Sequence, residues 1–183
     1  LKLTPTIAVV TTIDEEHLDY YKDIHEIKDA FLEFINKVPF YGVAVLCLDE
    51  GHIQSLIPSV QKRYLTYGMS TQADYQAKEV SLQPLGSRFK VVHHGQDLGW
   101  FELAIPGIHN VSNSIAAIVV ARELDVDLEV IRRALKEFSG VQRRFQIKGE
   151  AGGILVVDDY GHHPTEIKAT LAAAKAAPGR RVV

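Results

Sequence analysis

The segment "YGVAVLCLD", residues 41–49, constrains the fold more than any other part of the chain, because every residue before its final Asp is apolar or small. An uninterrupted apolar run is typical of a strand covered on both faces in a parallel sheet. It is much shorter than the roughly 20 residues that a membrane-spanning helix needs. We therefore predict an α/β fold, with a mostly parallel sheet flanked by helices, and no membrane partner.

The flanking segments extend this pattern into a βαβαβ series. "TIAVVTT" (6–12) is predicted to be a strand, and a helix follows it because apolar residues recur at spacings of three and four. A short helix over 53–60 and a strand over 63–68 complete the series, with right-handed crossovers expected. The apolar positions of the first helix are Ile24, Ile27, Phe31, Phe34 and Ile35.

The middle of the chain changes character. Short alternating stretches over 74–83, 87–94 and 98–105 are separated by turn residues, which predicts a small antiparallel β meander inserted after the α/β core. Two helices are expected next, over 109–124 and 127–138. Asp127 is the expected N-cap of the second helix.

Glycines at both ends of residues 139–153 indicate a domain boundary. We predict that residues 1–143 belong to a central domain and that residues 144–183 begin a C-terminal one. There, "ILVVDDY" (154–160) is predicted to be a second buried strand. A helix should start at Pro164 and end before Pro178-Gly179, and "RRVV" (180–183) should open another strand.

Composition narrows the classes of function. Hydrophobic residues make up 46% of the chain and the formal net charge is −3, so a soluble globular protein is expected, without the basic excess that nucleic acid would require. The single cysteine, Cys47, lies inside the apolar run. A buried free thiol in a reducing compartment, the cytoplasm, is therefore predicted.

"DDYGHHPTE" (158–166) places polar side chains between the end of a strand and the start of a helix, where α/β proteins bind ligands and helix N-termini bind anions. Asp158 and Asp159 could accept hydrogen bonds from ribose hydroxyls or hold a cation. His162 and His163 could donate, accept or ligate a metal. The alternative is that Asp158 or His163 caps the helix and that the remainder is a solvated loop.

Three further clusters have both a functional and a structural interpretation. "TTIDEEHLDYY" (11–21) offers His17 and nearby acids to Mg²⁺, or it is an acidic helix start capped by Asp14. In "PGIHNVSNS" (106–114), Asn110 and Asn113 could contact an adenine edge or cap a helix.

The last of the three clusters lies in the predicted boundary loop. In "GVQRRF" (140–145), Arg143 or Arg144 could clamp a phosphate, or both could be solvated.

In their order along the chain, "HLDYY", "PGIHNVSN", "GVQRRF" and "DDYGHHPTEI" resemble the Mur ligase family, over essentially all 183 residues. The resemblance implies part of a central ATP-binding domain followed by the start of a Rossmann-like C-terminal domain. It implies an ATP-dependent ligase of peptidoglycan synthesis, which activates a carboxylate as an acyl phosphate that an amine attacks. Tyr160, Gly161 and Glu166 favour joining UDP-N-acetylmuramate to L-alanine. The alternative is the recycling ligase that adds a tripeptide, whose loop usually reads more like "DDFAHHPTA".

The same resemblance implies a role for each cluster. His17 would bind Mg²⁺, and Asn110 with Asn113 would hold the adenine of ATP. Arg144, with Arg143 beside it, would reach the phosphates. The remaining assignments concern one loop: Asp159 and Asp158 would bind the ribose, while Tyr160, His162 and His163 would face the alanine and the acyl phosphate.

The sequence departs from the family pattern in three respects. Thr12 stands where the family generally has Asn, and Glu16 where it usually has Asp. No G-x-x-x-x-G-K-[ST] loop for ATP phosphates occurs in the chain. We therefore expect an internal piece of the enzyme that lacks ligase activity by itself. A non-catalytic nucleotide-binding module is the alternative, and no oligomeric state is predicted.

Overall fold

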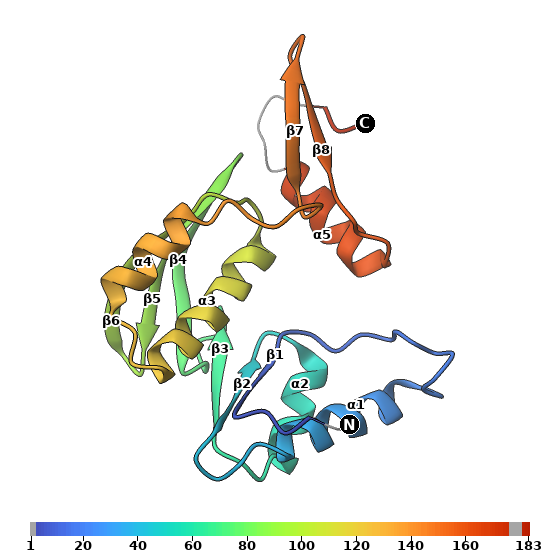
Figure 1. Cartoon of the computed structure of the whole chain (residues 1–183), viewed down its shortest axis with the longest axis vertical. Coiled ribbons are helices and arrows are strands. Elements are labelled where there is room, and N and C mark those ends of the chain that lie inside the picture. Colours follow the sequence, from blue (N-terminus) through green and yellow to red (C-terminus); the bar gives the residue numbers. More distant parts are fainter. Residues whose placement is uncertain (1–2, 176–180) are drawn as a thin grey trace.

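The computed structural model describes residues 3–175 and 181–183, which form a large α/β unit followed by a small one (Figure 1). The first unit is built on a six-stranded sheet in the order β1-β2-β3-β4-β5-β6. The pairs from β1 to β4 are parallel, and β4, β5 and β6 pair antiparallel. The strands are β1 (Ile7–Val10), β2 (Val43–Cys47), β3 (Tyr64–Gly68), β4 (Tyr75–Gln83), β5 (Gly86–His93) and β6 (Gln96–Leu103).

Strand β2 is buried along its whole length, as its apolar sequence predicted. Helix α3 (Ile108–Glu123) packs against β2, β3, β4 and β5. Helices α1 (Ile24–Asn36) and α2 (Gly51–Leu56) pack together, and Figure 1 places them across β2 from α3. The mostly parallel α/β fold is thus confirmed, and Cys47 is a buried free thiol in it.

Helix starts follow the local sequence signals. The Asp23 carboxylate caps α1 by accepting from His25 N and Glu26 N. Asp127 caps α4 (Leu128–Glu137) by accepting from Glu129 N, as predicted, and α4 packs against β6. The helix expected over 53–60 begins earlier, at Gly51, and ends in a 3₁₀ turn over Ile57–Ser59. Proline in that turn lacks the N–H that an α-helix would need there.

The predicted antiparallel meander is confirmed as strands β4, β5 and β6. They extend the same sheet, because β4 pairs parallel with β3 through Tyr67 and Tyr75. The Asp74 carboxylate accepts from both the backbone N–H and the hydroxyl of Thr66, at 2.7 and 2.8 Å. This pair of hydrogen bonds holds the start of β4 beside β3 and so joins the meander to the core.

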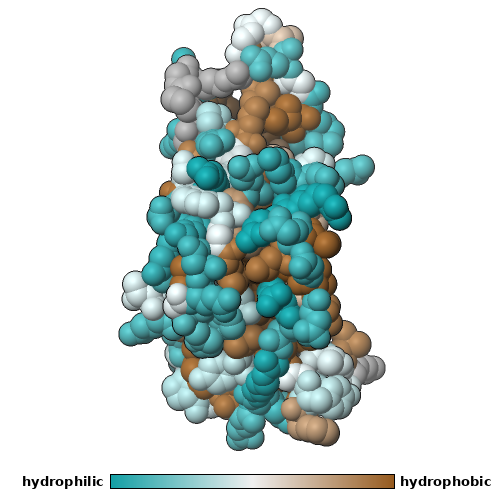
Figure 2. All heavy atoms as spheres, turned by 90° about the vertical axis from the view of Figure 1, so that its left-hand side faces the viewer, coloured by the Kyte–Doolittle hydropathy of each residue, from teal (hydrophilic) through white to brown (hydrophobic). Residues whose placement is uncertain are grey.

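The second unit consists of a hairpin, β7 (Gln146–Ala151) and β8 (Ile154–Asp158), and of α5 (Pro164–Lys175). The prediction that β8 is buried is wrong: Ile154 and Val156 are 68% and 55% exposed. In the part of the chain that the structure describes, β8 pairs with β7 alone, so its apolar side chains remain uncovered. The hairpin lies at the top of the molecule in Figure 1, and Figure 2 shows hydrophobic surface near that end.

The predicted final strand is absent from residues 181–183, while Arg180 and the predicted Pro178-Gly179 helix stop lie outside the described residues. No helix in the described ranges is long and apolar enough to cross a membrane.

Candidate active site

The loop after β8 is braced by Asp159. Its Oδ1 accepts from Gly161 N at 2.7 Å and its Oδ2 accepts from Phe145 N at 2.8 Å. Among the described residues, the Asp158 carboxylate makes only a 3.7 Å ion pair, with Lys148 Nζ. The connecting segment between α4 and β7 is residues 138–145, and the polar loop between β8 and α5 is residues 159–163. Asp159 therefore attaches the connecting segment to the polar loop.

The structural alternative for this loop, a helix capped by the side chain of Asp158 or His163, is wrong. Neither side chain makes a capping hydrogen bond among the described residues. Instead, the His163 carbonyl accepts from Ile167 N at 3.0 Å, and His162 N donates to Glu166 Oε2 at 3.3 Å. The first turn of α5 is thus held by its own acid, Glu166, which also suits the positive end of the helix dipole.

Both arginines of the connecting segment contact the polar loop. Arg144 Nη1 donates to Glu166 Oε1 at 3.0 Å, and this bond is the main reason that the pKa of Glu166 is lowered. The Arg143 guanidinium lies 4.5 Å from the centre of the Tyr160 ring. The backbone carbonyl of Arg143 accepts a hydrogen bond from Tyr160 N at 2.7 Å. Both arginine side chains are exposed to solvent, as the alternative interpretation expected, and each also contacts the polar loop.

The two histidines of the loop differ in exposure. The side chain of His162 is 72% exposed, with Nδ1 at 3.2 Å from the Tyr160 carbonyl and the two rings in edge contact. The side chain of His163 is 23% exposed and turns towards the loop after β1, where Asp14 and Glu16 lie. The polar loop thus reaches the first unit through His163.

The loop after β1 carries His17 at its tip. His17 has a positive φ of 57°, and its carbonyl accepts from Tyr20 N and Tyr21 N. Its side chain is exposed and makes no hydrogen bond or ion pair with the other described residues. The interpretation of Asp14 as a helix cap is wrong, because α1 begins at Ile24 and is capped by Asp23.

The loop after β1 does not by itself supply a full set of metal ligands among the described residues. The described residues contain no group of three or more His, Cys, Asp or Glu side chains placed to hold a metal ion. Mg²⁺ commonly takes one or two protein ligands and fills its other positions with water and phosphate oxygens. His17 and its acidic neighbours therefore fit Mg²⁺ only as a sparse site of that kind.

The start of α3 presents the two asparagines. Gly107 occupies the N-cap position without a side-chain hydrogen bond, so capping by Asn110 or Asn113 is wrong. Asn110 Nδ2 donates to the Pro106 carbonyl at 2.6 Å, which leaves its amide oxygen without a hydrogen bond from the described residues. Asn113 is exposed and lines an apolar groove of about 490 Å³ between α3 and β1.

Sequence reasoning missed His109, which lies at the junction of the two units. Burial lowers the pKa of its imidazole, and the charge of Asp159 opposes that shift. A Cβ on Gly107 would meet His109 Cε1 at 2.6 Å and Ala173 Cβ of α5 at 3.3 Å. His109, the start of α3 and α5 therefore lie together. The only signal was its place directly before Asn110.

Acidification should destabilise the protein through two of its histidines. Burial is the main cause of the lowered pKa of both His93 and His109, and His93 Nε2 is buried without a hydrogen-bond partner. Because their folded-state pKa lies below the ordinary 6.5, the unfolded chain binds more protons, and stability falls as pH drops from 6.5 towards those lowered values.

Urea unfolding at pH of about 7.5 and about 5.5 tests this. The loss of stability should be smaller in His93→Gln, which carries no ionisable group at that position. An equal loss in the variant and the unsubstituted chain would contradict the assignment to His93.

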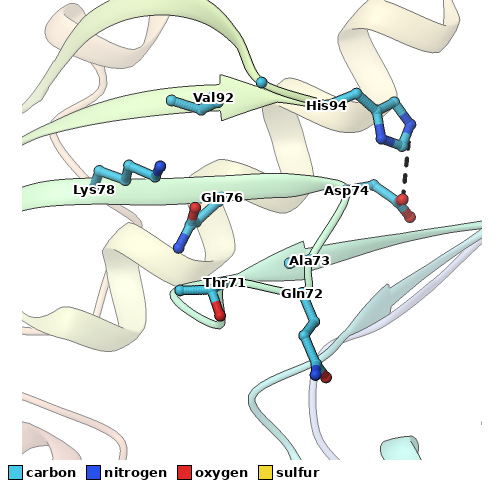
Figure 3. Close-up of a pocket in the computed structure, with 9 residues that line it drawn as sticks. Thr71, Gln72, Ala73, Asp74, Gln76, Lys78, Val92 and His94 are labelled. Carbon is cyan, nitrogen blue, oxygen red and sulfur yellow. Dashed lines mark ion pairs between the residues drawn. The ribbon is translucent and has the colours of Figure 1, made fainter.

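A polar pocket of about 350 Å³ lies elsewhere, between the β3–β4 loop and the β5–β6 turn (Figure 3). Asp74, Lys78 and His94 line it, with His94 Nε2 at 3.7 Å from Asp74 Oδ1. It contains none of the residues that the sequence singled out. The converging contacts of Asp159, Arg144 and His163 identify the junction as the better candidate.

The fold and the junction define an α/β protein whose two units gather polar side chains from widely separated segments. The profile of the Mur ligase middle domain matches residues 1–121, and that of the Mur ligase glutamate ligase domain matches residues 143–183. The chain belongs to the Mur ligase family.

Its relatives agree with this assignment. The chain is 58% identical over its 183 residues to the UDP-N-acetylmuramate–L-alanine ligase of Geotalea daltonii and 52% identical to that of Myxococcus xanthus. It spans 40% and 39% of the lengths of these two proteins.

Solved structures share the fold. The UDP-N-acetylmuramate-alanine ligase of Thermotoga maritima superposes with a TM-score of 0.79 at 28% identity, over 94% of this chain and 39% of that one. MurF from Acinetobacter baumannii superposes with a TM-score of 0.84 at 24% identity, over 94% of this chain and 38% of that one.

Proposed function

We propose that the chain supplies nucleotide- and amine-binding residues to an ATP-dependent ligase that joins UDP-N-acetylmuramate to L-alanine in cytoplasmic peptidoglycan synthesis. The observation that carries this proposal is the 58% identity, over the whole chain, to relatives named for that reaction. The reaction forms an acyl phosphate from ATP and the sugar carboxylate, and the amino group of alanine then displaces phosphate to give the amide. In this role, residues 1–143 would belong to the central domain and residues 144–183 to the C-terminal one.

Nucleotide binding would use groups that still have hydrogen-bonding capacity. The amide oxygen of Asn110 could accept from the exocyclic amine of adenine, with Asn113 one turn further along the same helix face. A carboxylate has about four lone-pair sites, and the two protein hydrogen bonds of Asp159 leave room for ribose hydroxyls, with Asp158 beside it.

Phosphate and metal binding would draw on the arginines and on His17. An incoming phosphate would compete with Glu166 for the guanidinium of Arg144. Arg143 is the neighbour of Arg144 in the sequence. Mg²⁺, held through His17, would neutralise charge between phosphate and carboxylate. The chain's own contribution is alignment, as in other phosphoryl transfers.

The alanine side of the reaction would face Tyr160, His162 and His163. Gly161 leaves room for the Asp159 carboxylate, because a Cβ there would lie 2.8 Å from Asp159 Oδ1. The usual loop of the recycling ligase has Ala at this position. In the present loop, an Ala side chain would crowd the Asp159 carboxylate. With Tyr160 and Glu166, Gly161 matches the loop pattern of the alanine ligase, and alanine is therefore the proposed amine.

Nucleotide binding can be tested by melting-temperature measurements. A ligand near 100 times its Kd stabilises by about 2.7 kcal/mol, or roughly 5–10 °C for a chain of this size. ATP with Mg²⁺ should raise the melting temperature, and His17→Ala should lose the Mg²⁺-dependent part. His25→Ala, on the exposed side of α1, is the matched control and should retain it. No rise with any adenine nucleotide would overturn the proposal.

The chain by itself should not catalyse the reaction, since it has no loop to cradle the ATP phosphates. A coupled assay of ADP release with UDP-N-acetylmuramate, alanine and ATP should therefore read background. Clear turnover dependent on all three substrates would contradict this expectation.

A further inference from the structure

A hydrogen bond joins a loop and a helix that are 151 residues apart in the sequence. Thr165 Oγ1, in the first turn of α5, donates to Asp14 Oδ2 in the loop after β1, at 2.5 Å. The other oxygen of Asp14 accepts from Glu15 N at 3.0 Å, which fixes the orientation of the carboxylate. The first unit therefore contacts α5 through one oriented acid.

His163 lies against the same acid. Its Nδ1 is 3.4 Å from Asp14 Oδ2 and 3.6 Å from Glu16 Oε1. This nitrogen is buried and has no hydrogen-bond partner among the described residues, so the two carboxylates are its nearest polar neighbours by these ion-pair distances. Carboxylates that face one ring nitrogen favour the tautomer with its hydrogen there, so Nε2 would be left as the free acceptor.

We propose that Asp14 is a positioning residue that reaches from the first unit to the start of α5, where it holds Thr165 and sets the tautomer of His163. The contact also fixes how α5 is seated against the loop that carries His17. Its consequence for amide formation rests on the proposed function, because His163 would face the reacting groups there. The positioning itself can be measured without substrate, so its failure and the failure of the proposed function are distinguishable.

The seating of α5 can be tested with spin labels at Asp29→Cys on α1 and Lys168→Cys on α5. Electron–electron distance measurements should give one narrow distribution in the otherwise unsubstituted chain, and a broad one in Asp14→Ala and in Thr165→Val. Thr165→Val removes only the hydroxyl, so it keeps the test valid if Asp14→Ala folds poorly. Glu15→Ala, an exposed neighbour, is the matched control and should keep the narrow distribution.

The tautomer of His163 can be read from its ring ¹⁵N chemical shifts. The hydrogen should reside on Nδ1 in the unsubstituted chain and in Glu15→Ala, and should move towards Nε2 in Asp14→Ala. A purely structural role of Asp14 would leave this signature unchanged. Unchanged distances in both variants, or an unchanged tautomer in Asp14→Ala, would overturn the proposal.

Discussion

Gly42→Ala should lower the free energy of unfolding by about 3 kcal/mol, at the upper end of what overpacking usually costs. A Cβ at this position would lie 2.2 Å from the Thr6 carbonyl oxygen and 2.7 Å from Val38 Cγ1. The Thr6 oxygen cannot retreat freely, because it accepts from Val43 N at 3.1 Å where β1 meets β2. The substitution therefore separates two strands at the start of the parallel sheet.

Thermal or urea unfolding measures this effect, with an expected fall in melting temperature of about 10 °C for a chain of this size. Gly51→Ala is the matched control. Nothing lies within 4 Å of its Cβ, and Gly51 is the first residue of α2. Alanine should there be neutral or stabilising by up to about 1 kcal/mol. Equal stabilities of the two variants would contradict the close approach at Gly42.

Local sequence signals predicted most elements of the first unit. The apolar run of β2 and the Asp127 cap of α4 depend on few neighbours, so they can be read directly. The burial of β8 could not be read this way, because its apolar residues do not reveal which strands and helices cover them. The attachment of the meander was also hidden, since it depends on Asp74 meeting Thr66 across a loop.

The candidate site was predicted in its residue types and not in its contacts. The motif 158–166 marked the polar loop, and Arg143 and Arg144 were identified next to the boundary. Their pairing with Glu166 and with the Tyr160 ring requires the loop and the connecting segment to lie side by side, which no periodicity encodes. Asp14 and Thr165 are a similar case, because their contact joins segments that are 151 residues apart in the sequence.

The connecting segment between α4 and β7 contains no helix or strand. The hydrogen bonds of Asp159 explain how it keeps its conformation. Between α4 and β7, Arg143 and Phe145 both have positive φ, at 58° and 47°, which is costly for residues with a side chain. The hydrogen bonds from Phe145 N to Asp159 and from Tyr160 N to the Arg143 carbonyl offset that cost. Without Asp159, the strained segment would lose its main anchor.

Asp159→Ala should therefore release the second unit, with a local stability loss of about 2–3 kcal/mol for two amide donors left without an acceptor. Hydrogen exchange of the amides at Phe145 and Gly161 should accelerate by roughly 30- to 100-fold, since each 1.4 kcal/mol corresponds to about a factor of 10. Asp158→Ala is the matched control, because within the described ranges that carboxylate has only the 3.7 Å pair with Lys148. Its exchange rates should stay within about threefold of the unsubstituted chain, as expected for the loss of an exposed ion pair. If the two substitutions accelerate exchange equally, Asp159 does not brace the junction, and the alignment of Arg143 and Arg144 with the polar loop must depend on Glu166 and Tyr160 instead.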